Sequence, residues 1–224
     1  MQSHAEYLTI SQDHNICVVP SWLSPIDAVA SLEWGHYAYQ FLKYVPATKE
    51  LKVLVNGASW AIWSSITQMY ALWWAEVTCI AHQENKEIIL GLWAKHFIDY
   101  TTQDVLEEWK KYDLILDTVG NISFLKAKSI LTSAWVYGSS ELWPARENVR
   151  YAFISLFSWK QKCKFPFPDN IKESMNYVLW LLEKWVYKPL IDQNAYALDE
   201  VAEAYTYVMK WHKNGSVMLT RGGV

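Results

Sequence analysis

The pattern of apolar and polar positions predicts strands that are each followed by a helix. Residues 51–55, Leu-Lys-Val-Leu-Val, form a short apolar run typical of a strand buried on both faces. Turn formers occupy residues 56–59, and apolar residues with helical spacing follow from Ile62 to Leu72. The same alternation predicts strands at about 51–56, 76–80, 96–99, 113–117 and 134–138, and helices at about 61–73, 84–92, 103–110 and 122–131. Right-handed crossovers between such units give a doubly wound parallel sheet, so the predicted fold class is α/β.

Further elements are expected outside this alternation. Three more helices are predicted, at about 24–43, 169–184 and 198–209. The first has Ser24 as its cap and Pro25 in its first turn. Residues 141–167 are predicted to be a loop region that contains a strand at 150–157, and residues 217–220 a last strand.

Glycine is scarce in this chain and tryptophan is abundant. The 224 residues include 8 glycines and 14 tryptophans, whereas average usage of about 7% would give roughly 16 glycines. Several indoles also stand where a turn or a helix end favours a small residue. The clearest cases are Trp60, Trp63, Trp74, Trp93, Trp135 and Trp185.

Charge, hydropathy and cysteines exclude several classes of function. A formal net charge of −3 gives no basic surface for nucleic acid. No signal-peptide pattern is present, and the apolar runs are too short to span a bilayer. We therefore expect a cytoplasmic protein with neither a nucleic-acid nor a membrane partner. Cys17, Cys79 and Cys163 are far apart, so neither a disulfide framework nor a Cys-x-x-Cys metal motif is expected.

Nine stretches, in order along nearly the whole chain, resemble one enzyme superfamily. They are residues 5–10, 23–30, 35–40, 53–65 (Val-Leu-Val-Asn-Gly-Ala-Ser-Trp-Ala-Ile-Trp-Ser-Ser), 75–77, 94–100, 112–120, 189–192 and 212–220. Together they are similar to the medium-chain dehydrogenase/reductase superfamily, in its zinc-free quinone oxidoreductase and enoyl reductase branch. The resemblance implies a Rossmann-type domain at 25–188. It also implies remnants of a β-rich GroES-like catalytic domain at 1–24 and 189–224, in a truncated chain.

The resemblance implies a dinucleotide site at the carboxyl ends of the strands. Its pyrophosphate turn would comprise Gly57, Ser59, Trp60, Ala61, Ile62 and Trp63, because amides at a helix N-terminus bind phosphate. A tight turn without a ligand is the alternative interpretation. The other expected contacts are His82, Lys86, Tyr100, Val119, Gly120, Gly138, Ser139, His212 and Gly215. No metal ligand set is expected.

NADP(H) is the preferred cofactor, and NAD(H) stays open. A carboxylate at the tip of the second strand would favour NAD, and none stands there. His82 and Lys86 would instead meet a 2′-phosphate, although Glu84 occupies a position where NADP-dependent relatives often have arginine.

The resemblance implies hydride transfer from a nicotinamide to a quinone or to an activated C=C or carbonyl compound, without zinc. No catalytic residue is identified, and a homodimer stays open. The alternative is a catalytically inactive nucleotide-binding or scaffold fragment.

The choice between these functions depends on tryptophans at positions where members of the resembled family have glycine. These are Trp60, Trp63, Trp74, Trp93, Trp135, Trp185 and Trp211, with Trp22, Trp109 and Trp159 as weaker candidates. One hypothesis is that they are glycine in the cell, because some bacterial lineages read the codon UGA as glycine whereas a common alternative code reads it as tryptophan. The rival hypothesis is a tryptophan-rich pseudoenzyme. A functional role for these indoles is excluded sterically, because an indole at either position 60 or 63 would occupy the volume of the cofactor.

Overall fold

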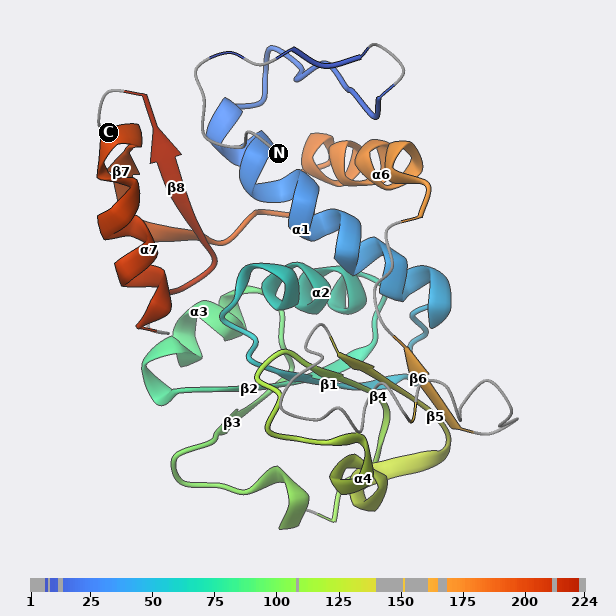
Figure 1. Ribbon diagram of the computed structural model, residues 1–224. Helices are drawn as coiled ribbons and strands as arrows, with labels where there is room; N and C mark the ends of the chain where they lie inside the picture. Colours follow the sequence, from blue (N-terminus) through green and yellow to red (C-terminus); the bar gives the residue numbers. More distant parts are fainter. Residues whose placement is uncertain are drawn as a thin grey trace.

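The protein has a six-stranded parallel sheet, seen in a computed structural model that describes residues 7, 9–11, 14–107, 109–139, 151, 161–164, 169–210 and 213–221 (Figure 1). The strands are β1 (Lys52–Asn56), β2 (Glu76–Ala81), β3 (His96–Asp99), β4 (Tyr112–Asp117), β5 (Leu131–Ser139) and β6 (Gln161–Lys164). They lie in the order β3-β2-β1-β4-β5-β6, and every neighbouring pair is parallel. From β1 to β3 the strands are added on one side of β1, and from β4 to β6 they are added on its other side, as in a Rossmann-type fold. The predicted doubly wound α/β class is confirmed.

Helices cover both faces of this sheet. In Figure 1, α1, α2 and α6 lie above the sheet and α4 lies below it. The helix bounds are α1 (Pro25–Tyr44), α2 (Ala61–Leu72), α3 (Lys86–Gly91), α4 (Phe124–Ala127) and α6 (Ile171–Glu183). Alternate residues of β1 enter two cores: Val53 and Val55 pack with Phe41 on one face, and Leu54 packs with Ile115 on the other. Burial on both faces explains why β1 reads as a continuous apolar run.

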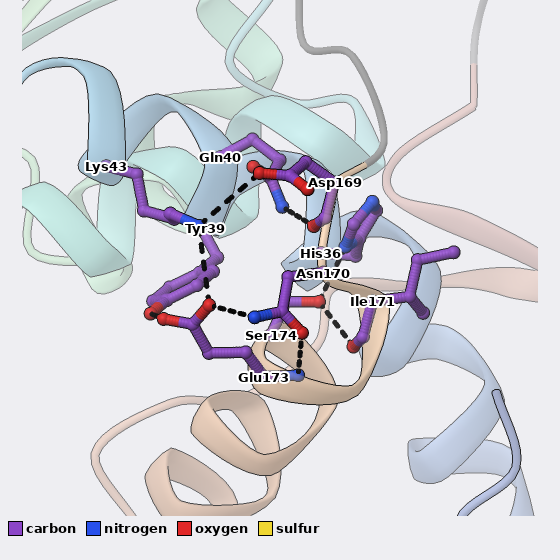
Figure 2. Close-up of polar contacts among 9 residues, drawn as sticks. All are labelled: His36, Tyr39, Gln40, Lys43, Asp169, Asn170, Ile171, Glu173 and Ser174. Atoms are coloured by element: carbon purple, nitrogen blue, oxygen red, sulfur yellow. Dashed lines mark hydrogen bonds and ion pairs between the residues drawn. The ribbon is translucent and has the colours of Figure 1, made fainter.

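The polar junction between α1 and α6 fixes the outer helix layer (Figure 2). His36 Nδ1 lies 2.6 Å from Ser174 Oγ, and Ser174 donates its own hydroxyl hydrogen to the carbonyl of Ile171. The ring therefore donates from Nδ1, while its buried Nε2 has no hydrogen-bond partner. The Glu173 carboxylate accepts from the Tyr39 hydroxyl at 2.6 Å and pairs with Lys43.

A smaller unit follows the sheet domain. It consists of β7 (Ile191–Ala197), α7 (Val201–Met209) and β8 (Ser216–Thr220), and its two strands pair in parallel. The helix and the last strand expected at the C-terminal end are confirmed. Within residues 1–24, the described positions form neither a helix nor a strand.

Three local predictions differ from the structure. The helix expected at about 103–110 is a single 3-10 turn, Val105–Glu107, because Val105 and Leu106 pack against the core whereas Trp109 is 93% exposed and adds no burial. The helix expected at about 122–131 is the short helix α4, which is followed by a 3-10 turn at Lys128–Ile130. β5 begins directly after that turn. β6 lies inside the predicted loop at 141–167, where pairing with β5 and burial of Cys163 override a weakly patterned sequence. Most of the strand expected at 150–157 lies outside the described residues.

Candidate functional site

The turn after β1 requires glycine at its first position. Gly57 has φ +87°, and a Cβ built there would lie 2.4 Å from the Thr118 hydroxyl oxygen. The amides of Gly57 and Ala58 both donate to the carbonyl of Ile80, at 3.1 and 3.3 Å. The turn therefore passes tightly across the carboxyl ends of β1, β2 and β4, where ligands of such sheets bind.

A buried hydrogen-bond network holds the two loops at this switch point. Asn56 Nδ2 donates to the carboxylate of Asp117 and to the side-chain oxygen of Asn121, each at 2.7 Å. The amides of Val119 and Gly120 also donate to Asp117. Burial raises the pKa of Asp117, and the bond from Asn56 opposes this shift. Asp117 thus orients the loop after β4.

The N-terminus of α2 faces this turn without a compensating side chain. Trp60 is the N-cap; it makes no side-chain capping bond, and the first turn contains no acidic residue. The first amides of a helix and its dipole favour an anion. Ala61 accepts hydrogen bonds from Ser64 and Ser65 through its carbonyl, so these hydroxyls leave the amide end of the helix available. The arrangement has the geometry of a phosphate site.

The two indoles of this turn occupy different environments. Trp63 is fully buried, with its ring 5.8 Å from that of Phe41 between α1 and α2. Its buried Nε1 has no hydrogen-bond partner among the described residues. The expectation that both indoles would occupy the cofactor's volume is therefore wrong for Trp63, which points into the core. Trp60 is half-buried at the helix entrance and is the indole that borders the site.

The C-terminal segment closes one side of the turn. The Gly215 amide donates to the carbonyl of Ser59 at 2.7 Å, and Trp60 and Gly215 form an isolated parallel bridge. Lys213 donates to the carbonyl of Gly215, and its Nζ lies 5.6 Å from the centre of the Trp60 ring. Burial lowers the pKa of Lys213, and the charge of Asp192 counteracts this.

Lys213 stands between two expected contacts, His212 and Gly215, but the sequence carries no separate signal for it. His212 and Trp211 lie outside the described residues. The proximity of this segment to the turn arises from the bond between Gly215 and Ser59, and therefore from the fold.

His82 and Tyr100 meet beyond the ends of β2 and β3. Their ring centres are 6.0 Å apart, and Tyr100 is 59% exposed. His82 Nδ1 lies 3.5 Å from the Glu84 carboxylate. Lys86 instead places its Nζ 6.0 Å from the centre of the Phe97 ring. The structure therefore brings His82 and Tyr100 together, with a carboxylate beside them, while Lys86 packs against β3.

The remaining expected residues divide into loop and core positions. Val119 is exposed at the switch point, and Gly120 has φ +74°. A Cβ at Gly138 would lie 2.4 Å from the Phe41 ring and 2.6 Å from Leu116, so glycine there serves core packing. Ser139 is fully buried at the end of β5.

Strand order, turn and helix terminus together define a Rossmann-type α/β protein with its candidate site at the switch point. A family model described as zinc-binding dehydrogenase matches residues 92–219, more than half of the chain. The chain belongs to this family, and the resemblance to the medium-chain dehydrogenase/reductase superfamily is confirmed.

Individual relatives are distant and longer than this chain. The mitochondrial NAD(P)H oxidoreductase RTN4IP1 of Mus musculus is 24% identical, over 76% of this chain and 48% of its own length. The quinone oxidoreductase of Coxiella burnetii has a TM-score of 0.79 at 18% identity, covering 90% of this chain and 63% of that chain. The CurK enoyl reductase has a TM-score of 0.75 at 15% identity, covering 92% and 65%. The chain thus spans about half the length of the curated relatives that it matches.

The described residues contain neither a cluster of metal-ligating side chains nor a membrane-spanning helix. No three His, Cys, Asp or Glu side chains lie together in a way that could hold a metal ion within the described part of the chain. None of the described helices is both long and apolar enough to cross a membrane. The mouse relative is named as mitochondrial, so the cytoplasmic location stays a prediction.

Proposed function

We propose that this protein is an NAD(P)H-dependent oxidoreductase that reduces a quinone or an activated C=C or carbonyl compound. The observation that carries the proposal is the uncapped N-terminus of α2, which meets the glycine turn at the switch point of the sheet. Membership of a dehydrogenase family supports it.

The residues of the chain have distinct binding roles in this proposal. Amides at the start of α2 and the ammonium group of Lys213 hold the pyrophosphate. His82 and Tyr100 border the adenosine end, and Val119 and Gly120 flank the path towards the nicotinamide. Trp60 is the residue of this turn that fits the proposal least well, because its indole stands at the helix entrance where the backbone should approach the phosphates.

The nicotinamide supplies a hydride when it is bound, and the chain positions it and excludes water. Addition of that hydride and one proton would reduce the quinone, C=C or carbonyl group by two electrons, and no group of this chain is assigned as the proton donor. The described residues offer no metal cluster, so no step is assigned to zinc. Zinc independence is part of this proposal.

NADP(H) remains our preferred cofactor, with NAD(H) as the alternative. His82 supports a 2′-phosphate contact, whereas the Glu84 carboxylate 3.5 Å from it opposes one. Since Lys86 packs on Phe97, it contributes less to this preference than its sequence position suggests.

A second candidate is a nucleotide-binding or scaffold protein without catalytic activity, or a pseudoenzyme that binds no dinucleotide. The observation that favours it is the Trp60 indole at the helix entrance. This candidate applies if Trp60 and Trp63 are genuine.

Turnover separates these functions. The unaltered chain, a W60G/W63G variant and a W109G control would be incubated with NADPH or NADH and a quinone or an enone. We expect nucleotide oxidation that depends on both the acceptor and the W60G/W63G change. Binding of the nucleotide without its oxidation would favour the scaffold function. A variant that shows no nucleotide binding and no nucleotide oxidation would contradict the proposal.

A further inference from the structure

Three helices end on a tryptophan whose backbone is left-handed. In the part of the chain that the structure describes, four residues other than glycine have positive φ: Trp74 (67°), Trp93 (68°), Trp185 (57°) and Asn170 (42°). Such a conformation places Cβ against the following carbonyl, so residues with bulky side chains rarely adopt it. Tryptophan supplies three of the four cases, although only 14 of the 224 residues are tryptophan.

The hydrogen bonds at these helix ends form the motif that glycine normally completes. After α2, the Trp74 amide donates to Ala71 and the Ala75 amide donates to Tyr70, at 2.9 and 3.1 Å. This pair of bonds is a Schellman motif with Trp74 at the position after the C-cap.

The end of α6 repeats this motif. The Trp185 amide donates to Leu182 and the Val186 amide to Leu181, at 3.0 and 3.2 Å. After α3, the Trp93 amide donates to Leu90 at 3.1 Å. At all three ends the backbone conformation is one that glycine adopts without strain.

The side chains of these tryptophans bury too little surface to offset the strain of the left-handed backbone. Trp74 is 76% exposed, Trp185 is 84% exposed and Trp93 is 49% exposed. Two other tryptophans differ: Trp73 donates from Nε1 to the Tyr177 hydroxyl at 2.9 Å, and Trp180 stacks on the same ring. Neither Trp73 nor Trp180 has positive φ. Backbone conformation and side-chain contacts thus separate two groups of tryptophan.

Trp60 and Trp63, in the turn before α2, also stand where glycine fits better, but for reasons other than a positive φ. Trp63 buries an indole N–H without a partner, which is costly in a core. Trp60 occupies an N-cap without providing the capping bond that the usual N-cap side chains make. Trp22 and Trp109 do not have positive φ, so their backbone conformation does not require glycine.

We infer that residues 60, 63, 74, 93 and 185 are glycine in the protein as its own cells make it, and that Trp73 and Trp180 are genuine. The corresponding codons are UGA at the five positions and UGG at the two, with UGA read as glycine. The part that concerns residues 60 and 63 rests on the proposed function, whereas the part that concerns residues 74, 93 and 185 rests on backbone geometry. With glycine at 60, no indole stands at the entrance to α2, and the turn becomes an unobstructed phosphate cradle.

Peptide mass spectrometry of the protein from its own cells tests the inference directly, together with the codons of the gene. Glycine at the five positions with tryptophan at 73 and 180 supports it. Tryptophan at any of the five, or UGG codons there, overturns it. This result is independent of nucleotide binding, so it can fail or succeed separately from the proposed function.

A stability series tests the backbone argument in an ordinary expression host. W74G, W93G and W185G should each raise the Tm by about 2–4 °C, because they relieve left-handed strain while losing little buried surface. The matched controls W73G and W180G should lower the Tm. Lower melting points for W74G and W185G would overturn the inference.

Discussion

The ammonium group of Lys213 lies 5.6 Å from the centre of the Trp60 ring, at the entrance to α2. These residues come from opposite parts of the chain, and the bond from the Gly215 amide to the Ser59 carbonyl joins their segments. The charge that faces the candidate phosphate turn therefore comes from the C-terminal unit. The turn and this unit together form the proposed dinucleotide site.

Replacing Lys213 should weaken dinucleotide binding. In the W60G/W63G background, we expect K213Q to lower NADPH affinity about tenfold, or ~1.4 kcal/mol, because a charge-assisted contact to phosphate is lost. The control K210Q, at an exposed site on the end of α7, should bind as before. Isothermal titration calorimetry measures both, and equal affinities for the two variants would contradict this role.

The glycine at the head of the turn should be irreplaceable. G57A should lower the free energy of unfolding by about 1–3 kcal/mol, since its Cβ would lie 2.4 Å from the Thr118 hydroxyl at φ +87°. G91A is the matched control: a Cβ there meets nothing within 4 Å, and alanine favours a helix by up to about 1 kcal/mol. Urea unfolding of both variants should show opposite signs, and a neutral G57A would contradict the geometry.

Acidification should weaken the junction between α1 and α6. Burial lowers the pKa of His36, with Asp169 opposing the shift, so the folded state holds the ring neutral. The unfolded chain binds the additional proton, so stability is complete above the ordinary pKa of about 6.5 and falls as the pH drops below it. Urea unfolding at about pH 7.5 and 5.5 should show this loss. H36Q should show a smaller loss, whereas the exposed control H14Q should behave like the unaltered chain.

A second pH effect should appear in more acidic solution. Lys95 and Lys110, each 2.9 Å from the Glu76 carboxylate, lower the pKa of that group to about 2. Because this pKa is depressed, its contribution to stability is present above about pH 4.5 and disappears as the pH falls towards 2. E76Q should therefore lose stability at neutral pH and little at about pH 2, whereas the exposed control E87Q should change at neither. An equal loss at both pH values would contradict the assignment.

Local signals in the sequence were sufficient for the sheet and for several helix boundaries. The buried strand at 51–55 appears as β1, and Ser24 caps α1 by accepting from the Asp27 amide at 3.0 Å. Asn170, at the expected start of a helix, caps α6. These features depend on residues near one another in the chain, so pattern and capping chemistry predict them.

Contacts between distant residues account for what could not be predicted. The burial of Trp63 against Phe41, the pairing of His36 with Ser174 and the approach of Lys213 to Trp60 each join separate elements. Pairing with a neighbour also decides β6, whose sequence carries little alternation. Such features follow from packing, which periodicity does not specify.

Dinucleotide binding by the W60G/W63G protein tests the central claim most directly. NADPH and NADH would be titrated by calorimetry into this variant, the unaltered chain and the W109G control. The account predicts saturable, one-site binding by the variant and much weaker binding by the other two proteins. A folded W60G/W63G protein that binds neither nucleotide would contradict the claim that the turn before α2 is a dinucleotide site.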